Sequence, residues 1–77
     1  MIIYKRKPTS EDVANLDMEE ELIYYKSDEI ALCINYVDDR YLVRKKQISS
    51  NELLYDKILK TIDEVMEFIK REDANDL

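Results

Sequence analysis

The sequence predicts an α+β fold in which a small antiparallel sheet of three to four strands packs against one long C-terminal helix. Apolar residues recur at every second position within residues 22–46, which is typical of strands, whereas after residue 50 they recur at helical spacing. Short acidic stretches interrupt the alternation twice, as turns do. The expected order is strand, short helix, three strands and helix. The 77 residues predict a single domain over 1–72, followed by a frayed tail at 73–77.

The N-terminal segment predicts a strand and a short helix. The strand runs from Ile2 to Lys7 and ends at Pro8, because proline cannot continue a strand ladder. Thr9 is followed three positions later by Asp12, which resembles a capping box and predicts a helix within residues 10–17. The sequence does not determine which strand of the sheet the first strand pairs with. Pairing with the last strand of the meander would bring the cations of residues 5–7 beside those of residues 40–47.

The middle of the chain predicts a three-stranded meander. Two-residue turns at Ser27-Asp28 and Asp38-Asp39 place Ile23 opposite Leu32 and Ile34 opposite Val43. Because side chains alternate, one set is expected to face the core: Ile23, Tyr25, Ile30, Leu32, Ile34, Tyr36, Tyr41 and Val43. The other face is expected to carry Leu22, Tyr24, Ala31, Cys33, Asn35, Val37, Leu42 and Arg44.

The C-terminal third predicts a helix over residues 50–72. Ser49 and Glu52 have the spacing of a capping box. An apolar stripe follows at helical spacing, formed by Leu54, Tyr55, Ile58, Leu59, Ile62, Val65, Met66 and Ile69. Charged residues occupy the opposite side. This stripe and the core face of the meander are expected to form the hydrophobic core.

Two absences limit the chemistry of the chain, which contains no Gly and no His. Without Gly, the phosphate-cradling loops of nucleotide-binding proteins are excluded. Without His, a His-based catalytic triad and a His metal site are excluded. Cys33 is expected in a strand among apolar neighbours, where it acts as a small hydrophobe. We therefore expect no enzymatic activity, no cofactor and no specific metal.

The net charge of -6 is distributed in blocks. Residues 1–10 carry +3, residues 11–21 carry -6 and residues 40–47 carry +4. The overall acidity argues against general binding to nucleic acid or anionic membranes. A single Cys, charges close to the N-terminus and no long apolar run predict a cytoplasmic protein. The abundance of residues with AT-rich codons indicates a low-GC bacterium or a phage, so the cytoplasm is that of the cell or of an infected host.

The leading functional prediction is a small non-enzymatic interaction module, such as an inhibitor or regulator, that binds another protein. Carboxylates on a small acidic surface can imitate phosphates and occupy the basic channel of a nucleic-acid-handling partner. The candidate carboxylates are Glu11, Asp12, Asp17, Glu19, Glu20 and Glu21. The second sheet face is too apolar to stay bare, and its candidate anchors are Leu22, Tyr24 and Leu42. The segment 10–17, a second copy and a foreign protein remain alternative covers for that face.

Two alternatives remain. The first is a nucleic-acid-binding module that uses an aromatic residue among cations, namely Arg40, Tyr41, Arg44, Lys45 and Lys46. The order of elements from residue 9 resembles that of double-stranded-RNA-binding domains. Residues 49–54 are neutral to acidic where that family is basic, so the chain is not assigned to it. The second alternative is a homodimeric structural accessory protein.

Overall fold

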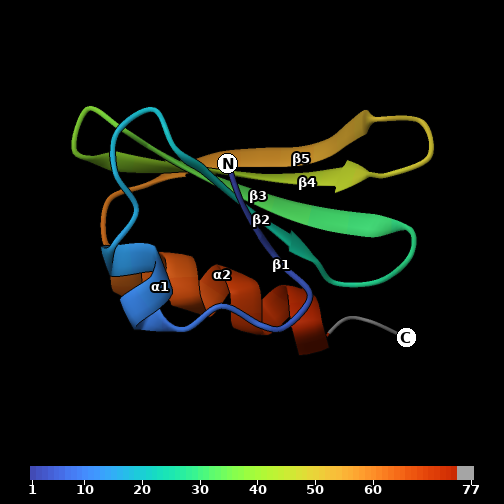
Figure 1. Cartoon of the computed structure of the whole chain (residues 1–77), viewed down its shortest axis with the longest axis horizontal. Helices are drawn as coiled ribbons and strands as arrows, with labels where there is room; N and C mark the ends of the chain where they lie inside the picture. The colour runs from blue at the N-terminus through green and yellow to red at the C-terminus, as the bar shows by residue number, and fades with distance from the viewer. Residues whose placement is uncertain (75–77) are drawn as a thin grey trace.

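The chain folds into a five-stranded sheet with two helices on one of its faces, as the computed structural model of residues 1–74 shows (Figure 1). In chain order the elements are β1 (Ile2–Tyr4), α1 (Ser10–Ala14), β2 (Glu21–Tyr25), β3 (Ile30–Val37), β4 (Arg40–Gln47), β5 (Glu52–Leu59) and α2 (Ile62–Ala74). The strands lie in sequence order across the sheet, with β1 parallel to β2 and all other pairs antiparallel. The predicted α+β class and C-terminal helix are confirmed, but the sheet is mixed and has five strands.

The β3–β4 hairpin has the predicted register. Tyr36 lies opposite Tyr41 and Ile34 opposite Val43. Asp38 and Asp39 form the turn with φ values of 51° and 62°, the left-handed conformation that both central residues of a tight hairpin turn require. Asp tolerates this conformation better than most residues because its short side chain bonds locally. The Tyr36 hydroxyl also donates a hydrogen bond to Asp39 Oδ1 at 3.0 Å.

The predicted register of β2 is wrong by one residue. Leu22 lies opposite Ile34, and Tyr24 opposite Leu32. The connection, residues 26–29, is longer than a two-residue turn because Ser27 Oγ accepts hydrogen bonds from the Glu29 and Ile30 amides, at 3.2 and 3.1 Å. A one-residue shift exchanges the two faces of a strand.

The exchange of faces applies to β2 alone. Leu22 and Tyr24 therefore face the core, whereas Ile23 and Tyr25 lie on the other face of the sheet. The faces predicted for β3 and β4 are confirmed.

The predicted helix over residues 50–72 is wrong in its first half, which forms β5. This strand pairs with β4 from Tyr41 opposite Leu59 to Gln47 opposite Glu52, with one register shift between Lys45 and Lys46 that leaves Leu54 without a partner on β4. Asn51, with φ of 55°, makes the turn before it. Leu54, Tyr55, Ile58 and Leu59 thus belong to a strand. The spacing of these residues fits a helix, but their pairing with β4 makes the segment a strand. Such pairing between distant parts of the chain cannot be read from local spacing.

The helix α2 begins after Thr61 in a second capping box. Thr61 Oγ1 accepts the Glu64 amide at 3.2 Å, and Glu64 Oε1 accepts the Thr61 amide at 3.1 Å. The helix runs through Ala74, two residues past the expected end of the domain at residue 72. Residues 75–77 of the expected tail lie outside the described residues. Within residues 1–74, neither helix is long and apolar enough to cross a bilayer.

The first strand, the loop after it and α1 are joined by hydrogen bonds to the carboxylate of Asp12. Tyr4 and Arg6 donate hydrogen bonds to this carboxylate at 3.1 and 2.9 Å, and the Thr9 amide donates another at 2.8 Å. Thr9 caps α1, which confirms the predicted short helix. Because β1 pairs with β2, it lies at the opposite edge of the sheet from β5. Of the placements that the sequence left open, the one that brings residues 5–7 beside β4 therefore does not occur.

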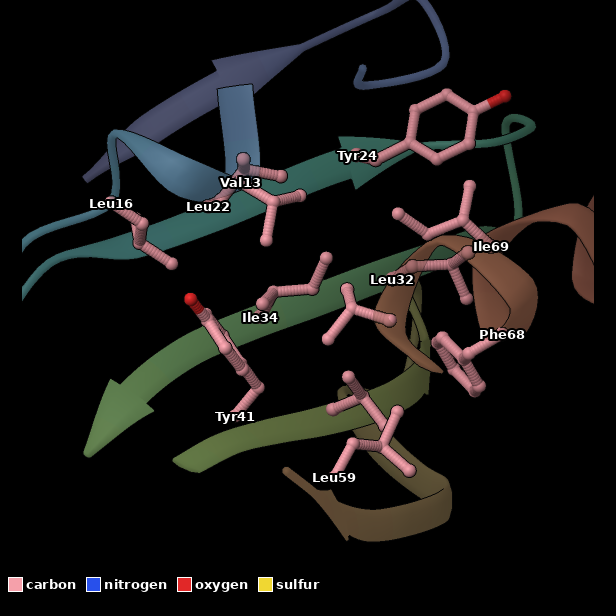
Figure 2. Close-up of a cluster of buried hydrophobic side chains, with 12 residues drawn as sticks. Val13, Leu16, Leu22, Tyr24, Leu32, Ile34, Tyr41, Leu59, Phe68 and Ile69 are labelled. Carbon is pink, nitrogen blue, oxygen red and sulfur yellow. The ribbon is translucent and has the colours of Figure 1, made fainter. Parts of the chain in front are cut away.

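The core lies between the sheet and the two helices (Figure 2). The helices and the residues just after α1 contribute Val13, Leu16, Val65, Phe68 and Ile69, and the strands contribute Leu22, Tyr24, Leu32, Ile34, Tyr41, Val43 and Leu59. The Tyr24 hydroxyl reaches the end of α2 and donates a hydrogen bond to Asp73 Oδ1 at 3.0 Å. The helices thus cover one face of the sheet, and the opposite face is left to form a surface.

The start of α2 can be tested with two alanine substitutions. We expect Thr61→Ala to lower the free energy of unfolding by about 1 kcal/mol in urea denaturation, because the first turn of α2 loses its cap. Ser49→Ala is the matched control, since Ser49 would begin the helix predicted from sequence but lies in the exposed turn before β5. Its expected effect is below about 0.5 kcal/mol. Equal losses would contradict a helix start at residue 61.

The Asp12 cluster predicts a dependence of stability on pH. A hydrogen bond from the Arg6 guanidinium holds the pKa of the Asp12 carboxyl well below its usual range. A hydrogen bond from the Thr9 amide lowers this pKa further, by a smaller amount. In the unfolded chain this pKa returns to about 3.9, so below that value the unfolded state binds more protons and stability falls as the pH falls.

The Asp12→Asn variant isolates this effect. We expect it to unfold in less urea than the parent at neutral pH and to lose part of the parent's decline in stability below about pH 4. Glu11→Gln, which removes a neighbouring charge of the same helix, should keep that decline. An unchanged pH profile for Asp12→Asn would show that the ion pair does not contribute.

Candidate functional site

The face of the sheet opposite the helices is the candidate site, and we call it the open face (Figure 1). The strand registers place on it Ile3, Glu21, Ile23, Tyr25, Ala31, Cys33, Asn35, Val37, Arg40, Leu42, Arg44, Lys46, Asp56 and Ile58. Three of its aliphatic side chains are about half exposed: Ile3 at 50%, Val37 at 49% and Ile58 at 59%. An apolar surface that spans several strands is unusual for a side of a sheet that faces only water.

A polar network crosses the centre of the open face. Arg44 on β4 donates hydrogen bonds to Glu21 on β2 and, at 2.8 Å, to Asn35 on β3. The Arg44 and Glu21 side chains are each 26% exposed, so the ion pair is partly shielded from water. The network joins three adjacent strands through their side chains. The Arg44 guanidinium is thus already bound to groups of the same chain.

Two hollows lie on the open face. One, of about 200 Å³, is lined by Ile23, Tyr25, Cys33 and Lys46 among others. The second, of about 390 Å³, is lined by Val37, Asp38, Arg40, Leu42 and Ile58. The second hollow lies beside β5 and combines aliphatic walls with one cation, Arg40, and one carboxylate, Asp38. Both offer recesses for side chains of a bound partner.

Cys33 is buried on the open face beneath its neighbours. Burial raises the pKa of its thiol, and the charge of Glu21 raises it further. The thiol is therefore protonated near neutrality and serves in packing. Within residues 1–74, the structure gathers no group of three or more Cys, Asp or Glu residues in an arrangement that holds a metal ion.

The open face differs in charge from the rest of the chain. It carries the cations Arg40, Arg44 and Lys46 against the carboxylates Glu21 and Asp56. Its net charge of +1 contrasts with the -6 of the whole chain. The excess of acidic groups therefore lies elsewhere, including on α2, whose first turn carries two carboxylates. The molecule has a weakly basic, apolar side and an acidic side.

The acidic candidates lie on α1, on the loop that leads to β2 and on the first residue of β2. Asp12 and Glu21 are in ion pairs with Arg6 and Arg44, and Glu20 accepts the Asp17 amide at 3.1 Å. Three of the six predicted carboxylates are thus engaged inside the fold. The remaining members of the set are Glu11, Asp17 and Glu19, all of which are exposed.

The apolar candidates divide between the core and the open face. Leu22 and Tyr24 are buried against the helices, with 0% and 7% of their surface exposed, so their predicted place on the surface is wrong. The cause is the one-residue shift of β2. Leu42 lies on the open face as predicted. Ile23 takes the position opposite Cys33 that was expected for Leu22, and Tyr25 takes the position opposite Ala31 that was expected for Tyr24.

The basic candidates also divide between the two faces. Tyr41 is buried in the core, and Lys45 faces α2, where its Nζ lies 2.9 Å from Glu72 Oε1. Arg40, Arg44 and Lys46 lie on the open face. The structure therefore does not bring the predicted aromatic residue and its cations together on one surface.

Sequence reasoning missed Ile3, Ile23, Tyr25 and Ile58 as members of the open face. Ile58 was assigned to a helix because Leu54, Ile58 and Ile62 satisfy helical spacing. The signal for Ile23 and Tyr25 was Ser27, whose side chain favours a longer turn by bonding to nearby amides. A longer turn would have exchanged the faces of β2.

Comparison with known proteins leaves the open face to be interpreted from its own geometry. A scan against protein-family models finds no match, and neither curated proteins nor solved structures match the chain.

Proposed function

We propose that this chain is a small non-enzymatic protein-interaction module that binds a partner protein through its open face. The observation that carries the proposal is an apolar sheet face that the helices of the fold do not cover. Strands about 4.8 Å apart and up to eight residues long give this face an area of roughly 500 Å². That is of the order of the ~800 Å² that each partner buries in a stable protein–protein interface.

The charges of the open face indicate the chemistry of the partner. Arg40 and Lys46 lie toward its two ends, and the Glu21–Arg44 pair lies between them. An apolar patch with acidic groups at its rim complements this arrangement. Such a partner would be repelled by the acidic remainder of the chain, so the charges also select the orientation of binding.

The open face supports the proposal better than the acidic segment does. Imitation of phosphates needs several carboxylates that are available to a partner, whereas Asp12, Glu20 and Glu21 make contacts inside the fold. Binding at the open face would cover a surface of the partner. A module of this size acts by such occlusion, as inhibitors and regulators do.

Two substitutions on the open face test the proposal. A photo-crosslinking residue at position 37 in the host cell should trap the partner, whereas one at Glu67 on α2 should not. With the trapped protein purified, we expect Val37→Glu and Leu42→Glu each to weaken binding at least about tenfold, or about 1.4 kcal/mol. Circular dichroism and urea denaturation would verify that both variants fold.

Charge reversal on the acidic segment provides the control. Glu11→Lys together with Asp17→Lys should leave the affinity within about twofold, because neither residue lies on the open face. Loss of binding in this variant, with normal binding by Val37→Glu, would favour the phosphate-imitating surface instead. Retention of single-stranded nucleic acid at physiological salt would favour the nucleic-acid alternative.

A further inference from the structure

The two edges of the sheet differ in length and in side chains. β1 at one edge has three residues, whereas β5 at the other has eight. β5 pairs with β4 on one side, so the backbone groups on its other side point outward. It also carries four large exposed apolar residues: Leu53, Leu54, Tyr55 and Ile58. A long apolar edge of this kind is a template for another strand.

Hollows lie along β5 on both faces of the sheet. On the side of α2, a hollow of about 380 Å³ is lined by Tyr55, Lys57, Leu59, Phe68 and Arg71 among others. Its wall includes the stacked rings of Tyr55 and Phe68, whose centroids are 5.9 Å apart. On the open face, Ile58 borders the 390 Å³ hollow described above. A strand added to β5 would direct alternate side chains into both hollows.

We propose that the strand added to β5 is β5 of a second copy of this chain, in antiparallel orientation. The charges along the strand favour this occupant and this direction. Glu52 begins the strand and Lys60 follows its end. An antiparallel pair places Glu52 of each copy beside Lys60 of the other, whereas a parallel pair would place like charges together. The proposal does not depend on the function proposed for the open face.

The register that pairs Glu52 of each copy with Lys60 of the other is centred on Asp56. It places Leu54 of each copy opposite Ile58 of the other, and Tyr55 opposite Lys57, where a cation–π contact forms. The two Asp56 carboxylates meet at the symmetry axis, and each has Arg44 opposite it on β4. Because Arg44 also pairs with Glu21, it offsets only part of the repulsion between the two Asp56 carboxylates.

The symmetry axis has a consequence for the open face. A two-fold axis between antiparallel strands of one sheet is perpendicular to that sheet, so opposite residues lie on the same face. The dimer is then a ten-stranded sheet with its helices on one side and both open faces on the other. The two open faces would form one continuous surface across the axis.

Sedimentation velocity of the full chain, under reducing conditions and at about 1 to 100 micromolar, measures this association. We expect a dimer whose dissociation constant rises at least about tenfold in Leu54→Lys and in Ile58→Lys, because lysine on an edge strand opposes pairing. Ile3→Lys is the matched control: Ile3 is as exposed as Leu54 but lies on β1 at the opposite edge of the sheet, so this variant should remain dimeric. It should nevertheless lose the partner, which separates this proposal from the preceding one.

A disulfide test checks the register. In a Cys33→Ser background, Asp56→Cys should form a covalently linked dimer on oxidation, because opposite residues of antiparallel strands have Cα atoms about 4.5 to 5.5 Å apart. Val37→Cys in the same background should stay unlinked. A parent chain that sediments as a monomer at every concentration would overturn the proposal. So would an Ile3→Lys variant that dissociates as strongly as Leu54→Lys.

Discussion

The register of β2 and β4 on the central strand β3 decides which side of the sheet each residue occupies, and the rest of the structure depends on it. Side chains alternate along a strand, so a shift by one residue moves a whole set from core to surface. With Leu22 opposite Ile34 and Ile34 opposite Val43, three aliphatic side chains meet beneath the helices. The same pairing places Ile23, Cys33 and Arg44 in one row on the open face. Core and candidate site are thus two consequences of a single register.

The placement of α2 follows from this core and leaves β5 bare. Val65, Phe68 and Ile69 pack into the cluster formed by the inner strands, and Lys45 on β4 is paired with Glu72. β5 continues the sheet past this contact, so most of its side chains are exposed on both faces. The open face and the bare edge therefore have one origin, which is a sheet wider than the helices that cover it. A chain of this length has no further helix among its described residues to cover the remainder.

The sequence was sufficient where local chemistry decides the structure. The turn at Asp38-Asp39 fixed the β3–β4 register, and Thr9 with Asp12 located α1. Local patterns failed at β5, because Leu54, Tyr55, Ile58 and Leu59 satisfy helical spacing and Ser49 with Glu52 imitates a cap. Pairing with β4, which spans a different part of the chain, resolved the ambiguity. For the site, Leu42 and Cys33 were placed correctly, but the members contributed by β2 depended on the length of one turn.

A glycine-free chain makes its turns at an energetic cost that bears on binding. Glu19, Asp38, Asp39 and Asn51 adopt positive φ, and only Asn and Asp do so readily among residues with side chains. A domain of this size buries only about 60% of the surface of its unfolded chain, so its stability is small. Any protein that binds only the folded state adds RT ln(1 + [L]/Kd) to the free energy of unfolding, where [L] is the concentration of the free partner and Kd its dissociation constant. Covering β5 or the open face therefore strengthens the fold itself, and association and folding are energetically linked in this chain.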